Sequence, residues 1–279
     1  MTTQKPVEKR PRGRPRSPFT DTSGSTIQSL ERGLLVLGEL SRTSRMSLSD
    51  LAAETGLPAS TLHRILITFE KHGFTDLDEA TQTWRIGVEA FRVGSSFLRQ
   101  TNLAELGRGV MRQLMDETDE TVNLAIPDKT EVVFIAQVET QQPIRAFFRP
   151  GTRSPMHASG IGKALLAAMP ETAAEQVIQK AGLEAFTDKT LASRAELLAD
   201  LAQIRQRGWS VDDEERHTGM RCVAATIFDS LGDPVAGVSV SGPTARISPD
   251  AIARLGPAVQ RAAFALSEAL GGTHPDQPD

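Results

Sequence analysis

The segment LPASTLHRILITFEKHG, Leu57–Gly73, decides how the first third of the chain folds. Pro58 suits a first helical turn and Gly73 suits a helix end, so the segment predicts a single helix. Its apolar side chains form one stripe: Leu62, Ile65, Leu66 and Phe69. The opposite face carries hydrogen-bonding and basic side chains but no carboxylate: Ser60, Thr61, Arg64, Thr68 and Lys71, with His63 at its edge. Such a face suits DNA base edges and phosphates, although an ordinary solvated face is the alternative.

The surrounding sequence predicts the rest of a winged helix-turn-helix over residues 25–86. Apolar residues at helical spacing predict a first helix over 27–40, and a second helix follows over 47–56, between a serine cap and a glycine stop. The alternating stretch 74–86 predicts a two-stranded hairpin, which would form the wing. On this wing Arg85 either contacts DNA phosphate or is an ordinary surface residue.

The remainder of the chain predicts a linker helix over 87–102 and a larger domain over 103–271. In that domain helices are predicted at 103–118, 160–169, 171–181, 194–208 and 249–270. Strands are predicted at 121–127, 131–138, 144–149, 209–213, 222–229 and 235–242. Several strands follow one another with no helix between them, which indicates an antiparallel sheet with helices packed against it, a fold of α+β class. Residues 272–279 are expected to be a disordered tail.

The first 24 residues contain the basic stretch PRGRPRSP in a chain whose formal net charge is only −4. Prolines and the scarcity of large apolar side chains predict a disordered tail. Its arginines, Arg12, Arg14 and Arg16, resemble the core of an AT-hook, in which arginine side chains lie along a narrow minor groove. A basic tail that only increases solubility is the alternative.

Other classes of protein find little support in the sequence. The glycine-lysine pair of SGIGKALL lacks the remaining residues of a phosphate-binding loop, and no nucleophile elbow or zinc-protease motif occurs. The acidic run in VDDEERHTG is interpreted as a solvated loop rather than a catalytic site. The single cysteine excludes an internal disulfide, and its spacing to the five histidines does not suit zinc. We therefore expect no enzymatic activity, catalytic residue, metal or cofactor. With no apolar run long enough to span a membrane and no signal peptide, we expect no membrane partner and a cytoplasmic location.

Three separated motifs carry a resemblance to a known family. They are ASGIGKALLA at 158–167, GWSVDDEERHTGMRCVAATIFD at 208–229 and VAGVSVSGPTARIS at 235–248. Together with the helix-turn-helix before them, they resemble the IclR family of bacterial transcription regulators from about residue 25 to 270. The resemblance implies a winged helix-turn-helix, a GAF-like effector domain, and homodimers that commonly pair into tetramers on pseudo-palindromic operators in double-stranded DNA.

The same resemblance implies an effector pocket, whose matched positions are Gly160, Ile161, Asp212, Met220, Cys222, Ser239 and Ser241. Gly160 and Ile161 stand at the start of a predicted helix, where free amides and the helix dipole favour an anion. Ser239 and Ser241 lie two apart on one predicted strand, so their hydroxyls share a face. An aspartate in such a pocket disfavours a dianion, which indicates a small oxo or hydroxy acid.

This combination of residues is similar to the glyoxylate-sensing group of the family, which implies glyoxylate as the effector. An aromatic or other organic acid is an alternative, because many family members bind aromatic acids. A further alternative is that the GAF-like domain serves only for oligomerisation.

Overall fold

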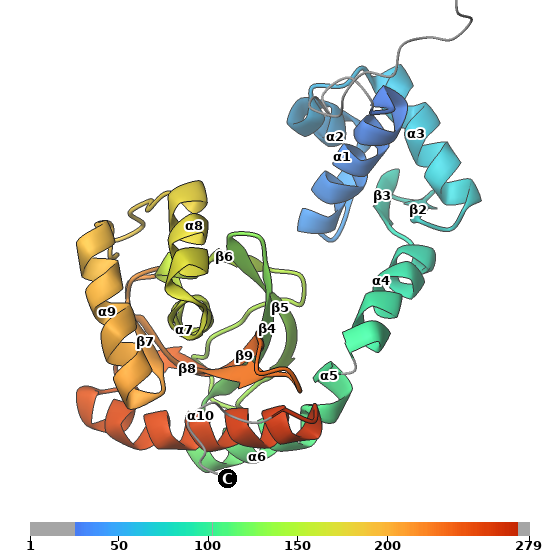
Figure 1. Cartoon of the computed structure of the whole chain (residues 1–279). Helices are drawn as coiled ribbons and strands as arrows, with labels where there is room; N and C mark the ends of the chain where they lie inside the picture. The colour runs from blue at the N-terminus through green and yellow to red at the C-terminus, as the bar shows by residue number, and fades with distance from the viewer. Residues whose placement is uncertain (1–25, 102, 273–279) are drawn as a thin grey trace, which may run out of the picture. The chain divides into compact units, whose positions relative to one another are not determined.

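The computed structural model describes residues 26–101 and 103–272, which divide into two compact units between Ser95 and Ser96 (Figure 1). The helix α4 (Val88–Thr101) crosses this division. The predicted basic tail with Arg12, Arg14 and Arg16 lies outside the described residues, as do residues 273–279.

The first unit is the predicted winged helix-turn-helix. Its helices are α1 (Gln28–Arg42), α2 (Leu48–Thr55) and α3 (Ala59–Lys71). Its strands β1 (Met46–Ser47), β2 (Thr75–Asp78) and β3 (Thr83–Ile86) form an antiparallel sheet in the order β1-β3-β2. Sequence reasoning missed β1, whose two residues are too few to show a period.

Local chemistry sets the turn between α2 and α3. Ser47 and Asp50 form a reciprocal capping box at the start of α2. Gly56 ends that helix with a φ of 66°, a conformation that glycine adopts without strain. As a result, Leu51 of α2 and Leu62 and Leu66 of α3 are all fully buried in one core.

The predicted first helix has two different apolar faces. The apolar spacing from 27 to 40 correctly predicted a helix, but its members do not share one environment. Leu40 is buried together with Val36, whereas Ile27, Leu30 and Leu34 are each more than half exposed. The spacing was helical because α1 has two apolar faces, and only one of them packs against the unit's own core.

The second unit is built on a six-stranded antiparallel sheet in the order β6-β5-β4-β9-β8-β7 (Figure 1). The strands are β4 (Thr121–Asp128), β5 (Glu131–Val138), β6 (Arg153–Pro155), β7 (Ser210–Asp213), β8 (Met220–Phe228) and β9 (Pro234–Pro243). The strand expected at 144–149 is absent, so that prediction was wrong. The edge of β5 pairs instead with residues 151–155, which leaves the preceding segment no strand to join.

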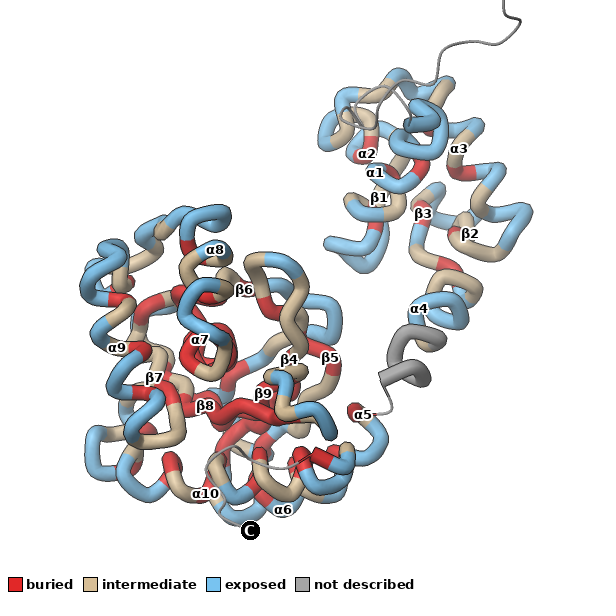
Figure 2. The backbone as a smooth tube through the Cα atoms, viewed as in Figure 1, coloured by how far each residue is buried: buried red, intermediate tan, exposed pale blue. Residues whose placement is uncertain are grey.

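Helices cover both faces of this sheet, and the buried residues concentrate where they meet it (Figure 2). On one face lie α5 (Leu103–Leu106), α6 (Arg108–Thr118) and α10 (Pro249–Ala269). On the other lie α7 (Gly160–Ala168), α8 (Glu171–Ala181) and α9 (Arg194–Arg207). The helix expected at 103–118 is interrupted at Gly107, where a Cβ would lie 2.9 Å from the Leu103 carbonyl oxygen. The architecture is the predicted α+β class.

Within the described residues, no helix is long and apolar enough to cross a membrane. The same part of the chain contains no cluster of three or more side chains that would hold a metal ion.

Candidate functional site

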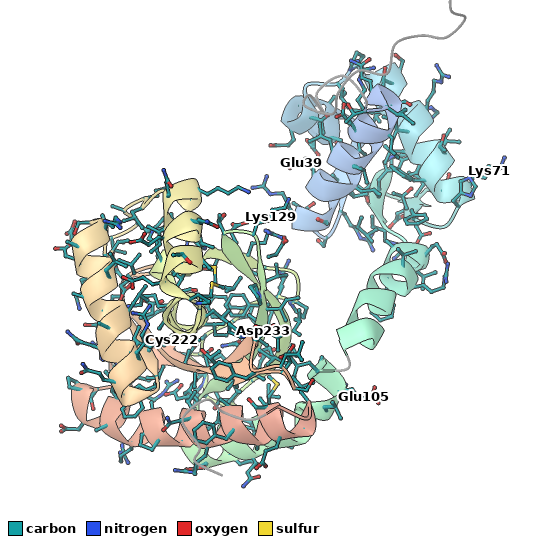
Figure 3. The ribbon with its side chains drawn as sticks, viewed as in Figure 1. Glu39, Lys71, Glu105, Lys129, Cys222 and Asp233 are labelled. Atoms are coloured by element: carbon teal, nitrogen blue, oxygen red, sulfur yellow. The ribbon has the colours of Figure 1, made fainter. Side chains whose placement is uncertain are left out.

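The outward face of α3 is a basic surface of the first unit. Ser60, His63, Arg64 and Lys71 are exposed there and Thr61 is half-buried; Figure 3 shows Lys71 pointing away from the unit's core. Ion pairs in this unit join Arg42 to Glu39, Arg45 to Asp78, Arg85 to Asp76 and Arg92 to Glu89. Among the described residues, Arg64 and Lys71 have no such partner, so their charges are free to meet an anion.

Arg85 on the wing differs from these residues. It is exposed, but its guanidinium lies 3.5 Å from the Asp76 carboxylate, directly across the β2–β3 pairing. A phosphate would have to compete with Asp76 for this arginine.

In the second unit, all seven expected pocket residues line one cavity of about 30 Å³. Gly160 and Ile161 come from the first turn of α7, Asp212 from β7, Met220 and Cys222 from β8, and Ser239 and Ser241 from β9. Such a volume exceeds the roughly 10–15 Å³ that one water molecule needs, but it is small for an organic ligand. The cavity therefore suits a compound of a few heavy atoms.

Strand register explains why residues distant in sequence meet. Asp212 pairs with Cys222, and Cys222 pairs with Ser241, so the three lie side by side across β7, β8 and β9. Ser239 lies two residues before Ser241 and pairs with Ala224 on the same face. The carboxyl, thiol and two hydroxyl groups thus share one side of the sheet.

The first turn of α7 closes the cavity from above this face. A Cβ on Gly160 would lie 2.7 Å from Cys222 Sγ, so no larger residue fits without displacing the thiol. Ser159 caps the helix, because its Oγ accepts a hydrogen bond from the Gly162 amide N–H at 3.0 Å. The amides of Gly160 and Ile161 come first in the helix, where no preceding turn supplies an acceptor. N–H groups in this position at a helix start are suited to bind an anion.

The two serine hydroxyls differ in their partners. Ser241 Oγ accepts a hydrogen bond from Asn123 Nδ2 at 3.2 Å, and Gln137 Nε2 donates to Asn123 Oδ1 at 2.8 Å. Ser239 is only 1% exposed, and its hydroxyl has no nitrogen or oxygen partner among the described residues, only a weak interaction with the Cys222 thiol. A buried polar group without a partner is costly and commonly marks the place of a ligand or water.

Burial controls the charge of the cavity's acidic groups. It raises the pKa of the Asp212 carboxyl from 3.8 to about 6, opposed by the hydrogen bond that Oδ1 accepts from the Glu215 amide at 2.8 Å and by the charge of Lys163. Burial and the neighbouring Asp212 raise the pKa of the Cys222 thiol to about 11. Cys222 is therefore neutral at physiological pH and does not repel an anion.

Several lining residues were missed by sequence reasoning. They are Phe134, Phe148, Ser159, Arg216, His217 and Arg221. The interpretation of VDDEERHTG as a solvated loop was wrong in part, because Glu215 is only 5% exposed and Asp212 lines the cavity. Arg216 belongs to the same run, and its guanidinium stacks 3.8 Å above the Phe186 ring. The sequence did carry one signal of this site: the acidic residues of the run stand beside Arg216 and His217. A loop that only faces solvent does not need acidic and basic residues together.

Two family models match the chain. The model of the IclR helix-turn-helix domain matches residues 29–79, and that of the bacterial transcriptional regulator IclR C-terminal domain matches residues 95–268. A helix-turn-helix unit followed by a unit with a small cavity is the arrangement of a DNA-binding transcriptional regulator with an effector domain, the class that these two models describe. The chain belongs to the IclR family of these regulators.

Individual relatives agree with this assignment. The chain is 46% identical to the HTH-type transcriptional regulator BhcR of Paracoccus denitrificans, over 92% of each protein. It is 41% identical to the acetate operon repressor of Salmonella typhimurium, over 94% of this chain and 98% of that one. The solved structure of Thermotoga maritima IclR superposes with a TM-score of 0.75 at 28% identity, covering 88% of this chain and 99% of that chain.

The basic face of α3 yields a first prediction. We expect Arg64→Ala to weaken binding to DNA from upstream of the protein's own gene by about 1–3 kcal/mol, because an unpaired arginine is lost from the contact surface. Arg85→Ala, the matched control, should have a smaller effect because Asp76 already holds that guanidinium. Fluorescence anisotropy at fixed salt measures both, and an equal loss in the two variants would remove the distinction between them.

The buried carboxyl yields a second prediction. Because the folded-state pKa of Asp212 is raised to about 6, the protein binds this proton more tightly than the unfolded chain does, and stability falls as pH rises from about 4 through 6. Asp212→Asn should therefore stabilise the protein above pH 7 by on the order of 3 kcal/mol and make little difference near pH 4.

Thermal unfolding between pH 4 and 8 measures this effect. Asp213→Asn is the control, because Asp213 is nearly half exposed and pairs with Arg221 and Lys189. A stabilisation by Asp212→Asn that did not vary with pH would contradict the assigned ionisation.

Proposed function

We propose that this regulator senses a small oxo acid, glyoxylate, in the cavity between α7 and the sheet. The observation that carries the proposal is the Ser239 hydroxyl, which has no nitrogen or oxygen partner among the described residues and is buried in a cavity of about 30 Å³ beside the first amides of α7. The acid's carboxylate would accept hydrogen bonds from the amides of Gly160 and Ile161. Its aldehyde or hydrated carbon would meet Ser239 and Asp212, which supply one hydroxyl and one carboxyl.

The size of the cavity favours this class of ligand over an aromatic acid, which would require the lining residues to move. A relative supports the same class of ligand, because the acetate operon repressor is named for a two-carbon acid. Glyoxylate has five heavy atoms, so a limit of roughly −1.5 kcal/mol per atom gives about −7.5 kcal/mol and a Kd no tighter than a few micromolar. Such an affinity suits a metabolite that accumulates.

On the DNA side, we propose that a homodimer, or a dimer of dimers, reads a pseudo-palindromic operator. The face of α1 with Ile27, Leu30 and Leu34 leaves large apolar side chains exposed, as does α4 with Val88 and Phe91. Exposed apolar groups of this kind are covered in an interface, and a second copy of the chain is the natural partner for a two-fold operator. Ligand binding would then alter the placement of the two DNA-binding units.

The ligand assignment is tested by titrating the protein–DNA complex with glyoxylate and, in parallel, with benzoate. We expect glyoxylate alone to shift the anisotropy curve, and Ser239→Ala to lose at least tenfold in glyoxylate affinity because the buried hydroxyl no longer meets the ligand. Ser230→Ala, an exposed serine after β8, is the matched control and should respond as the natural chain does.

A response to benzoate alone would replace the ligand with an aromatic acid. No response to either acid, with DNA binding intact, would favour a domain that serves only for oligomerisation.

The arginine tail is tested by replacing Arg12, Arg14 and Arg16 together with alanine. If the three side chains contact phosphates or the minor groove, the slope of log affinity against log salt should become shallower by up to about 3. The matched control replaces Arg112, Arg194 and Arg261 of the second unit. An unchanged slope in the tail variant would support the solubilising role.

A further inference from the structure

Lys163 is a buried charge that the effector site as described does not use. It belongs to α7, one turn after Gly160, and only 1% of its surface is exposed. Its Nζ donates to Glu215 Oε1 at 2.5 Å and to Asp200 Oδ2 at 2.7 Å. A buried ion pair recovers its desolvation cost poorly, so it is weak evidence for a purely stabilising role.

This ion pair connects directly to the cavity. Glu215, which accepts from Lys163 through its side chain, donates its backbone N–H to Asp212 Oδ1 at 2.8 Å. The second carboxylate oxygen of Glu215 is buried without a hydrogen-bond partner. Two hydrogen bonds therefore link Lys163 of α7 to Glu215, and Glu215 to Asp212 at the cavity wall.

The charged and titratable groups around Asp212 come from every element packed against it: Lys163 of α7, Asp200 and Arg207 of α9, Asp213 of β7, Arg221 and Cys222 of β8, and Glu215, Arg216 and His217 of the loop. Most of the cations have other partners. Arg221 pairs with Asp213, Arg207 with Asp200, and Arg216 lies over a ring. Lys163 is the cation whose charge lowers the pKa of Asp212.

Glu215 acts on Asp212 through its backbone rather than through the charge of its side chain. Burial is the main cause that raises the pKa of its carboxyl from 4.5 to about 7, opposed by Lys163 and assisted by the charges of Asp212 and Asp200. Because this pKa lies above that of Asp212, the Glu215 carboxyl is still mostly neutral at the pH where Asp212 ionises. Its backbone N–H and the charge of Lys163 both favour an ionised Asp212.

We propose that Lys163 and Glu215 are positioning residues that set the charge which Asp212 presents to the effector cavity. The consequence for effector binding rests on the proposed function. A neutral Asp212 donates a hydrogen bond to the bound acid, whereas an ionised one repels a carboxylate. Affinity for a monoanionic acid then falls as pH rises through the ionisation of Asp212, and Lys163 determines where that fall occurs.

The ionisation of Asp212 can be measured without any ligand. Asp212→Asn stabilises the protein only above the pH at which Asp212 ionises. This pH is called the onset here, and thermal unfolding of the full chain measures it. We expect this onset to move upward by about one pH unit in the Lys163→Met background, because the cation that favours the carboxylate is gone. In the Glu215→Gln background it should stay nearly unchanged, because the backbone N–H remains and the Glu215 carboxyl is already mostly neutral at this pH.

Lys189→Met is the matched control, since Lys189 pairs with Asp213 and Glu214 of the same acidic run but is half exposed. It should leave the onset unchanged. A shift in the Lys163→Met background that neither Glu215→Gln nor Lys189→Met produces is a signature that general loosening of the fold would not give. If Lys163→Met does not fold, Lys163→Gln is measured in its place: an upward shift supports the proposal and an unchanged onset overturns it.

A second readout uses glyoxylate. The pH at which its affinity falls should shift by the same amount and sign as the onset in each variant. If the onsets shift but the pH profile of glyoxylate binding does not, the link to effector binding is overturned. If the natural chain does not bind glyoxylate at all, the ligand assignment fails, while the onsets still decide the roles of Lys163 and Glu215.

Discussion

The contact between Gly160 and Cys222 is the constraint on which the effector domain depends. A side chain at position 160 would approach Cys222 Sγ to 2.7 Å, so only glycine lets α7 begin directly on the strand β8. Gly237 gives the same freedom one strand away, where a Cβ would lie 2.6 Å from Ile161 Cγ2. This close approach brings the free amides of a helix start within reach of hydroxyls on a sheet, and it keeps the cavity small.

The same close packing makes the site electrostatically costly. Placing α7 on the sheet buries Lys163, Glu215 and the Ser239 hydroxyl at 1%, 5% and 1% exposure. Each would be more stable in water, and the partners of Lys163 offset only part of its desolvation. The binding site and the unfavourable burial therefore have one origin, the close packing of α7 on the sheet.

Sequence reasoning predicted most of this arrangement, because the signals it used are local. Capping residues such as Ser47 and Gly56, and the alternation of Ser239 and Ser241, depend on near neighbours in the chain. The resemblance to the IclR family supplied positions that the strands bring together. The predictions that failed depended on contacts between residues far apart in the chain. The 144–149 segment is not a strand, because β6 already pairs with the edge of β5. Glu215, in an acidic run, is buried because Lys163, 52 residues earlier, contacts it.

The charge balance of the cavity bears on what it selects. Near neutral pH the thiol of Cys222 carries no charge, whereas Asp212, with a pKa of about 6, is largely ionised. The helix amides attract a bound monoanion, and Asp212 repels it only while the Asp212 carboxyl is ionised. Binding of the monoanion and protonation of Asp212 therefore favour each other. A dianion would need a second neutralising group: Arg221 is already held by Asp213, whereas Arg216, which also lines the cavity, keeps its charge in its contact with the Phe186 ring. On the proposed function, the charge of Asp212 and the position of Arg216 therefore decide which small acid the cavity favours.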